Sequence, residues 1–356
     1  MSTNGPTKRT GGRPTIRDVA EAVGMSKGTV SRALNNYADI SPATRARVAQ
    51  AAVELGYAPL AHAQAIRTGR ARALGLVLQM EQHDAQRPFL AEFLRGITRA
   101  ASARNWTLTV ATAESEEEGL ETYERLIAER KADGFILPRT RWHDPRVALL
   151  RAAGCPFVLF GRTADAEAEG CAWYDIRGGA AMQDAVRRLQ GFGHRRIGFI
   201  GAAPEFTYAR KRREGLHAAL LKAGLPTDDV LFDEGNATSE DGLAAATRLL
   251  AGKPAPTALV CATDTLAVGA VRALRMQGLK PGRDVSVIGY DGAPEGRAAD
   301  PPLTTYAVDQ TAAGARLADI LIALIDGTDP ESLRETAEAT LRPGGTDGPA
   351  PQSKRT

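Results

Sequence analysis

The stretch MSKGTVSRALN, residues 25–35, carries side chains that could form hydrogen bonds to nucleic acid. Its spacing predicts a short helix with Val30 and Leu34 on the inner face. The other positions are small or polar, as expected for a helix that leaves its outer face free to enter the DNA major groove. The residues expected to contact DNA from this helix are Ser26, Lys27, Gly28, Thr29, Ser31 and Arg32.

These side chains differ in the chemistry that they offer. The guanidinium of Arg32 could bind guanine with two hydrogen bonds, and Lys27 could reach a base or a phosphate. Ser26 and Ser31 could cap the helix or contact phosphate, and Gly28 would allow the backbone to approach DNA closely. The alternative is a small structural helical bundle that does not bind DNA.

Helical patterns on both sides of this stretch would position it. Thr15, which can also contact DNA, can cap a first helix that Gly24 ends, and Ser26 can cap the second. Ser41 followed by Pro42 is a strong start signal for a third helix. Two helices joined by a tight Gly turn fit a helix-turn-helix.

The charge distribution supports a polyanionic partner for this part of the chain. The 356 residues have a net charge of +3, but residues 1–72 contain eleven Lys or Arg against four Asp or Glu. The remainder carries 34 against 38 and is mildly acidic. A basic N-terminal part favours nucleic acid as a partner, although a solvated basic tail would have the same composition.

The rest of the chain is predicted to be α/β. Short continuous apolar runs alternate with amphipathic stretches, and this pattern is typical of parallel sheets covered by helices on both faces. The number of units indicates two doubly wound lobes. The apolar runs lie at 74–78, 107–111, 134–137, 156–160, 196–200, 258–261 and 285–289, and a helix is expected at 309–326.

The segment PTIRDVAEAVGMSKGTVSRALNNYADISPATRARVAQAAVELGYAP resembles the N-terminal domain of the LacI/GalR family of bacterial transcriptional regulators. The resemblance continues through GFGHRRIGFIG, RREGLHAAL, ATDTLAVGAVRAL, DVSVIGYDG and PPLTTY, so that it covers residues 14–342. It implies a helix-turn-helix domain, then a hinge, then a core similar to periplasmic sugar-binding proteins, with an effector bound between two lobes. It also implies a cytoplasmic homodimer on a pseudo-palindromic operator in double-stranded DNA.

In this family a hinge segment folds into a helix when dimer and DNA come together, and an apolar side chain enters the minor groove. The matching position here is Ile66. Such a wedge can kink a base step. An inert linker is the alternative interpretation of this segment.

The effector site is expected where strands end, because ligands of open α/β sheets bind at the carboxyl ends of strands. The resemblance places ligand-binding residues at Asp264 and Arg212. Asp291 fits a strand end, where it either orients the region between the lobes or touches ligand. Further candidates, each with a structural role as the alternative, are Phe89, Arg162, Asp175 and Tyr208. Arg177-Gly178 follows Asp175 where many relatives have Asp-Asn, which indicates a different effector.

Several other functions are disfavoured by the sequence. It contains no nucleophile elbow, phosphate-binding loop, dinucleotide fingerprint or His/Cys metal spacing, so no enzyme activity, cofactor or metal is expected. His194 follows Gly193 and precedes a strand, and it is expected to brace a helix end or a loop. The three cysteines of the chain lack paired spacing and are expected to be buried thiols of a cytosolic protein. No membrane span is expected. The rival to a sugar-responsive repressor is the solute-binding module of a sugar transporter.

These features predict the following organisation. Residues 1–13 form a disordered tail, residues 14–57 the helix-turn-helix domain and residues 58–71 the hinge. The core at 72–343 holds lobe 1 (about 72–172 and 303–327) and lobe 2 (about 173–302 and 328–343), and residues 344–356 form a second disordered tail.

Overall fold

The computed structural model describes residues 14–57, 69–79, 87–164, 170–228 and 232–352. The chain divides into two compact units, Met1–Ala71 and Arg72–Thr356. The predicted tail at 1–13, most of the predicted hinge, including Ile66, and the side chain of Phe89 lie outside the described residues.

The N-terminal unit, which we call the headpiece, contains the expected helix-turn-helix. It consists of α1 (Ile16–Val23), α2 (Lys27–Leu34) and α3 (Pro42–Leu55). Gly24 has φ 65°, a left-handed conformation that glycine adopts at little cost, and it makes the tight turn before α2. Val30 and Ala33 are buried, and Leu34, which was expected to face inward, is partly buried and packs against the same core. The headpiece core consists of Val19, Ala20, Val30, Ala33, Val48 and Ala52.

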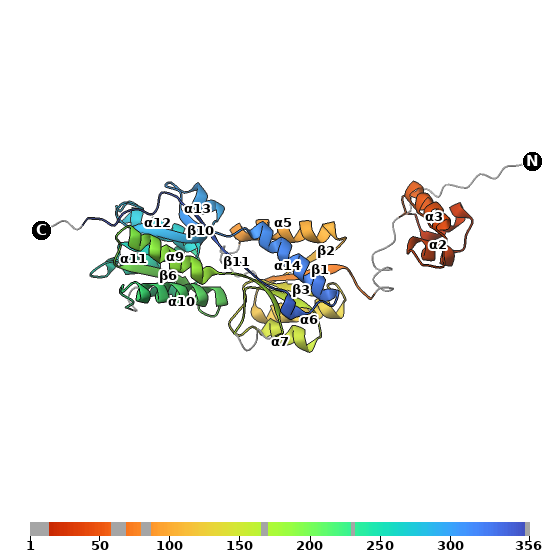
Figure 1. Ribbon diagram of the computed structural model, residues 1–356, viewed down its shortest axis with the longest axis horizontal. Helices are drawn as coiled ribbons and strands as arrows, with labels where there is room; N and C mark the ends of the chain where they lie inside the picture. Colours follow the sequence, from red (N-terminus) through yellow and green to blue (C-terminus); the bar gives the residue numbers. More distant parts are fainter. Residues whose placement is uncertain (1–13, 58–68, 80–86, 165–169, 229–231, 353–356) are drawn as a thin grey trace, which may run out of the picture. The chain divides into compact units, whose positions relative to one another are not determined.

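The core unit contains two six-stranded sheets, one in each lobe (Figure 1). In lobe 1 the strand order is β11-β5-β4-β3-β1-β2, and in lobe 2 it is β12-β10-β9-β8-β6-β7. Lobe 1 contains β1 (Ala73–Gln79), β2 (Thr107–Ala113), β3 (Gly134–Leu137), β4 (Phe157–Phe160), β5 (Ala172–Ile176) and β11 (Arg334–Ala337). Lobe 2 contains β6 (Ile197–Ala202), β7 (Phe232–Gly235), β8 (Ala258–Cys261), β9 (Ser286–Asp291), β10 (Thr304–Ala307) and β12 (Thr340–Arg342).

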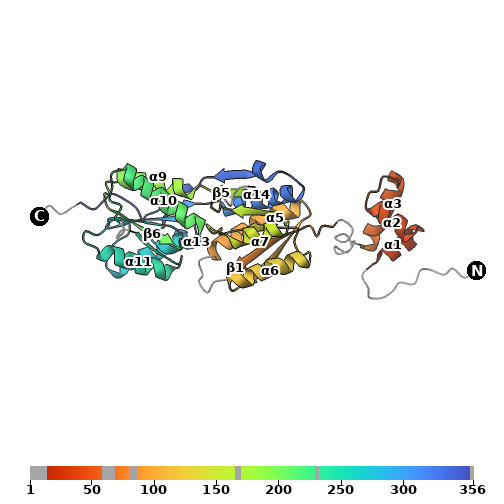
Figure 2. The ribbon, with the colours of Figure 1, turned by 90° about the horizontal axis from the view of Figure 1, so that it is seen from below.

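Helices cover both faces of each sheet, as the continuous apolar strands predict (Figure 2). In lobe 1 one face is covered by α5 (Arg87–Ala103) and α14 (Gln310–Ile325), and the other by α6 (Glu116–Ala128) and α7 (Pro145–Ala152). In lobe 2 the paired helices are α9 (Gly178–Gly191) with α10 (Thr207–Lys222), and α11 (Ser239–Ala251) with α12 (Asp264–Met276). The short α13 (Pro294–Ala298) packs beside α12.

The predicted lobe boundaries are wrong in three places. The strand at 172–176 was divided between the lobes, 304–307 was assigned to lobe 1, and 334–337 was assigned to lobe 2. In the structure β5 and β11 pair with each other in lobe 1, and β10 pairs with β9 in lobe 2. The chain therefore crosses between lobes next to residues 177, 308 and 338. Strand pairing sets these boundaries, and short mixed segments do not reveal their partners in the sequence.

The prediction that residues 344–356 form a disordered tail is wrong for the first part of this segment. Residues 343–350, which we call the C-terminal strap, pack against lobe 2. Thr346 is fully buried, and its Oγ1 accepts a hydrogen bond from Thr304 N (2.9 Å) and donates one to Val287 O (2.8 Å). The strap binds through backbone and small polar groups, so it has none of the apolar periodicity by which packed segments are detected.

His194 anchors the strap and has the bracing role that the sequence indicates. Its ring is fully buried, with Nδ1 2.9 Å from Thr257 Oγ1 and Nε2 3.0 Å from both Ser286 Oγ and Gly348 O. Burial lowers the pKa of His194, so the neutral ring is the form that these contacts hold.

Truncation after Pro343 is expected to destabilise lobe 2. Removal of the strap leaves buried groups of Val287, Thr304 and Ser286 without their partners, at about 1–3 kcal/mol each before water enters. We expect a loss of at least ~2 kcal/mol in urea unfolding. Truncation after Gln352 is the control, and equal stability of both truncated chains would contradict the role of the strap.

Candidate functional site

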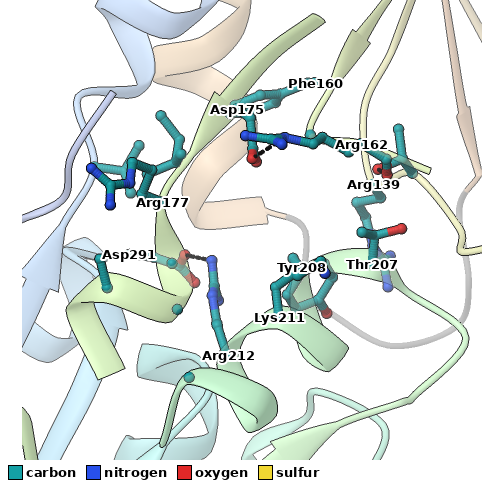
Figure 3. Close-up of a pocket in the computed structure, with 18 of the residues that line it drawn as sticks. Arg139, Phe160, Arg162, Asp175, Arg177, Thr207, Tyr208, Lys211, Arg212 and Asp291 are labelled. Carbon is teal, nitrogen blue, oxygen red and sulfur yellow. Dashed lines mark hydrogen bonds and ion pairs between the residues drawn. The ribbon is translucent and has the colours of Figure 1, made fainter. Parts of the chain in front are cut away.

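A cavity of about 540 Å³ lies between the lobes, at the carboxyl ends of strands from both sheets (Figure 3). Cavities of this size hold small organic molecules. Lobe 1 contributes Arg139, Phe160, Arg162 and Asp175 to its lining, and lobe 2 contributes Tyr208, Lys211, Arg212, Thr263 and Asp291.

Arg212 is the most enclosed cation of the cavity, with 8% of the residue exposed. Its Nη1 donates to Ala262 O at 2.5 Å and its Nη2 to Asp291 Oδ1 at 3.4 Å. The guanidinium also lies 3.6 Å from the centroid of the Tyr290 ring. Nη1 and Nη2 each donate to the protein, and the buried Nε–H has no partner within the described residues.

Close packing of α9 on α10 brings Arg212 to the cavity. A Cβ at Gly215 would lie 2.4 Å from Gly179 O, so only glycine permits this approach of the two helices. Gly178, one residue earlier, leaves room for the guanidinium, since a Cβ there would lie 3.1 Å from Arg212 Nε. Gly178 therefore lies directly against the most enclosed cation of the site.

Asp291 ends β9 in a strained backbone conformation. Its φ of 109° is one that residues with a side chain rarely adopt. Burial raises the pKa of Asp291 to about 6, and the neighbouring Arg212 opposes that shift. The structure places Asp291 in the lining of the cavity, beside Arg212.

Lobe 1 presents a second arginine–carboxylate pair to the cavity. Arg162 Nε donates to Asp175 Oδ2 at 2.8 Å, and the guanidinium lies 4.2 Å from the ring centroid of Trp173. Burial raises the pKa of Asp175, and the positive charge of Arg162 opposes this. Phe160 lines the cavity and stacks on Phe93 with ring centroids 5.4 Å apart. Each lobe therefore offers one ion pair and an aromatic ring.

Arg177 lies on a crossover between the lobes. Its backbone N donates to Ala337 O at 2.9 Å and its Nη1 donates to Glu338 Oε1 at 2.8 Å. Because residues 177 and 338 belong to two different crossovers, this pair joins them at the edge of the cavity.

A second connection between the lobes, which we call the lobe latch, joins residues 139–142 of lobe 1 to residues 205–211 of lobe 2. Arg141 and Phe206 form an isolated antiparallel bridge. Thr207 N donates to Thr140 O and Trp142 N donates to Glu205 O, each at 2.9 Å. The sequence analysis did not identify this contact, because it joins two loops that are far apart in the chain.

Aromatic rings and cations interleave in the lobe latch. The Phe206 ring centroid is 4.3 Å from the Arg139 guanidinium and 5.2 Å from that of Arg141. Across the junction, Arg210 and Lys211 each lie 5.2 Å from the Trp142 ring. Such contacts are worth about 0.5–1 kcal/mol each at exposed sites, so together they favour the closed arrangement of the lobes.

Asp264, which was expected to contact effector, is not among the residues that line this cavity, so that contact stays a prediction. Asp264 is 1% exposed, its Oδ1 accepts from Thr305 Oγ1 at 2.6 Å, and its Oδ2 accepts from Ala293 N at 2.6 Å. Thr263, one residue earlier, lines the cavity instead. Asp264 is the first residue of α12, and its carboxylate holds together the loops behind the site.

The structure brings five of the predicted effector residues together: Arg162, Asp175, Tyr208, Arg212 and Asp291. The sequence analysis missed Phe160, Arg139 and Lys211. Phe160 ends the apolar run of β4, and Arg139 follows β3 with a left-handed φ of 51°, so a search of every strand end would have found both.

The predicted DNA-binding residues of the headpiece lie on α2 or at its N-cap, apart from Thr15, which is the N-cap of α1. Ser26, Lys27, Gly28 and Arg32 are exposed. Ser26 Oγ caps α2 by accepting from Thr29 N at 3.1 Å, and it lies 2.9 Å from Thr29 Oγ1. Both hydroxyls are therefore used locally, and the guanidinium of Arg32 pairs with Asp39. Ser31 is half-buried, and Thr15 is exposed and donates to Asp18 Oδ2 from N (2.6 Å) and Oγ1 (2.8 Å).

Comparison with known proteins decides the family. Residues 15–59 match the family of bacterial regulatory proteins of the LacI type, and residues 71–342 match the family of periplasmic binding proteins and sugar-binding domains of LacI regulators. The chain belongs to the LacI family. It is 36% identical to the HTH-type transcriptional regulator AglR of Rhizobium meliloti, across 94% of this chain and 95% of AglR. It is 34% identical to CelR of Thermobifida fusca, across 92% of this chain and 97% of CelR.

Solved structures of LacI-family proteins have the same fold. The complex of the transcriptional regulator CelR with cellobiose has a TM-score of 0.72 at 32% identity, covering 94% of this chain and all of that one. The lac repressor dimer bound to operator and an anti-inducer has a TM-score of 0.79, covering 94% of this chain and 99% of that one. At 24% identity the latter supports the fold alone.

As a LacI-family member, the protein is a transcriptional regulator with a DNA-binding helix-turn-helix and a sugar-binding type of core. The relatives named above are HTH-type transcriptional regulators. Within the described ranges, no helix has the length and apolar character required to cross a bilayer.

Proposed function

We propose that this protein represses genes for carbohydrate uptake or catabolism and that a neutral sugar or sugar alcohol, bound between the lobes, controls its affinity for operator DNA. The observation that carries this proposal is the facing arrangement of Arg162–Asp175 and Arg212–Asp291 across one cavity. Paired charged groups bind adjacent hydroxyls, and Phe160 and Tyr208 offer apolar faces to the C–H surface of a sugar ring.

A neutral effector is favoured because four of the five lining cations are paired with carboxylates, in Arg162–Asp175, Arg212–Asp291, Lys211–Glu214 and Arg177–Glu338. Arg139 is the lining cation outside these pairs. A neutral polyhydroxylated ligand can both donate to Asp175 or Asp291 and accept from their arginine partners. The complex of CelR with cellobiose supports a carbohydrate as the class of ligand.

Effector binding is coupled to DNA binding through the relative orientation of the lobes. The active species is a homodimer that places two recognition helices in successive major grooves of a pseudo-palindromic operator. A ~1000-fold change in operator affinity requires the effector to favour one state by about 4 kcal/mol. A cavity whose walls belong to both lobes can supply this difference, since closure alters every contact at once.

Two steps test the function. A random duplex library is first selected with the full-length protein, and operator binding is then measured with a panel of mono- and disaccharides and sugar alcohols. We expect a pseudo-symmetric site and one carbohydrate that changes its affinity at least tenfold. Failure to enrich any sequence would contradict DNA-binding regulation, and a response only to nucleobases would contradict the carbohydrate effector.

Replacement of Arg32 with alanine is expected to weaken operator binding roughly 10- to 100-fold and to remove the base preference at one position of each half-site, since a bidentate arginine–guanine contact contributes about 1–3 kcal/mol. Lys27→Ala is the matched comparison. If Lys27 contacts phosphate, that variant loses affinity evenly across sequences and has a shallower salt dependence. An unchanged base preference in Arg32→Ala would assign base readout to other residues.

A further inference from the structure

Arg32 does not extend freely from the recognition helix. Its guanidinium forms an ion pair with the carboxylate of Asp39 and lies 5.5 Å from the ring centroid of Tyr37. Both charged side chains remain about half exposed, at 53% for Arg32 and 48% for Asp39. The candidate base-reading residue is therefore held from the side by the loop that follows its own helix.

That loop, residues 35–40, is itself well anchored. Tyr37 N donates to Arg32 O, and Ile40 N donates to Tyr37 O, each at 3.1 Å. Asn35 Nδ2 donates to Ser31 O at 2.6 Å, and Ile40 packs against the headpiece core. Asp39 is thus carried on a short loop that is tied to α2 at one end and to the core at the other.

The ion pair between Arg32 and Asp39 is not explained by a contribution to folding stability. Exposed ion pairs contribute little to folding free energy, because solvent screens the charges and both side chains lose rotamer freedom. The pair instead restricts the side chain of Arg32, which has many rotamers when free. A guanidinium has five N–H donors, so a carboxylate on one edge leaves donors on the other for O6 and N7 of guanine.

Asp39 also places a negative charge beside the surface that would face DNA. Its carboxylate repels phosphates, and this repulsion is present on every sequence. On the correct site the contact of the oriented Arg32 with a base compensates for this repulsion. On other sites no such base contact forms, so the repulsion is not compensated. The same side chain would then raise specific affinity and lower nonspecific affinity.

We propose that Asp39 is a specificity-determining residue, which orients Arg32 for base readout and disfavours binding to other sequences. The inference rests on the proposed function, because it requires that Arg32 reads a base. Asp39 lies outside the recognition helix, and it is negatively charged, whereas side chains that bind DNA are usually positively charged.

The test uses the full-length protein and the duplex that the wild type selects from a random library. In Asp39→Ala we expect roughly 5- to 20-fold weaker binding to that duplex and about 2- to 3-fold tighter binding to a scrambled one. Asp39→Ala should also reduce the base preference at the same base pair at which Arg32→Ala reduces it. Asp39→Asn keeps an acceptor for Arg32 without the charge, so it should retain most of the base preference while also binding scrambled DNA more tightly.

Glu21→Ala is the matched control. Glu21 forms an exposed ion pair with Arg17 on α1, with Nε and Oε1 3.0 Å apart, so its loss changes the headpiece charge equally without touching Arg32. The same loss of base preference in Glu21→Ala, or an unchanged preference in Asp39→Ala, would overturn the inference. If the wild type enriches no sequence, the proposed function itself fails, and this result is distinct from enrichment that is insensitive to Asp39.

Discussion

Arg212→Ala is expected to weaken effector binding at least ~100-fold while leaving operator binding without effector nearly unchanged. Arg212 is the most enclosed cation of the cavity, and its buried Nε–H has no hydrogen-bond partner within the described part of the chain. Its loss removes charge-assisted hydrogen bonds to ligand, each worth about 1.5–3 kcal/mol. It also leaves Asp291 without its partner, so the pKa of Asp291 should rise further and its carboxylate should be lost as an acceptor near neutral pH.

The measurement is calorimetric titration with the carbohydrate identified in the panel, together with operator binding in its presence and absence. Lys211→Ala is the neighbouring control, since Lys211 is exposed and paired with Glu214, and it should lose much less affinity. Arg212→Lys should resemble alanine, because a compact ammonium cannot reach both Ala262 O and Asp291. If Arg212→Ala bound effector with nearly wild-type affinity and unfolded in urea like the wild type, the effector site would have to lie elsewhere in the protein.

Asp264→Asn is expected to make the protein more stable than the wild type near and above neutral pH, by an amount that grows between about pH 4 and pH 7 and then levels off. Burial raises the pKa of Asp264 from 3.8 to about 7, and the nearby charge of Asp291 adds to the effect. The folded state therefore binds the proton more tightly than the unfolded chain. The stabilisation that this proton provides is complete below about pH 4 and is lost as pH rises towards 7. Between pH 5 and 8 the wild type should lose about 3 kcal/mol through this group.

Asparagine avoids that loss because it carries no charge at any pH. Its amide oxygen can accept from Ala293 N, and its amide nitrogen can donate to the hydroxyl of Thr305, which can turn to accept. Urea unfolding at pH 5 and pH 8 measures the difference, and Glu295→Gln in α13 is the control for an exposed carboxylate of the same lobe. Parallel pH dependence of wild type and Asp264→Asn would show that burial of Asp264 does not control stability.

The position of Asp264 gives the two experiments different readouts. Arg212 lines the cavity, so its loss should act on effector affinity. Asp264 lies behind the cavity and binds Thr305 and Ala293, so its protonation should act mainly on the stability of lobe 2. It reaches the site through Thr263 and through the charge of Asp291.

Local patterns were sufficient to predict the headpiece and the class of the core. Caps at Ser26 and Ser41, the left-handed Gly24, and apolar residues at helical spacing are properties of short segments, and each segment adopts the same structure wherever it lies. The buried strands β1, β3, β4, β6, β8 and β9 were detectable for the same reason, because strands covered on both faces are apolar throughout.

Tertiary structure alone decided which segments meet. The assignment of β5, β10 and β11 to their lobes, the C-terminal strap, the lobe latch and the burial of Asp264 all depend on contacts between residues far apart in the chain. Backbone hydrogen bonds and single polar side chains make these contacts, and such groups have no periodic signature that identifies their partners. The same holds for Arg32 and Asp39, seven positions apart, since only the folded loop between them brings the carboxylate to the guanidinium.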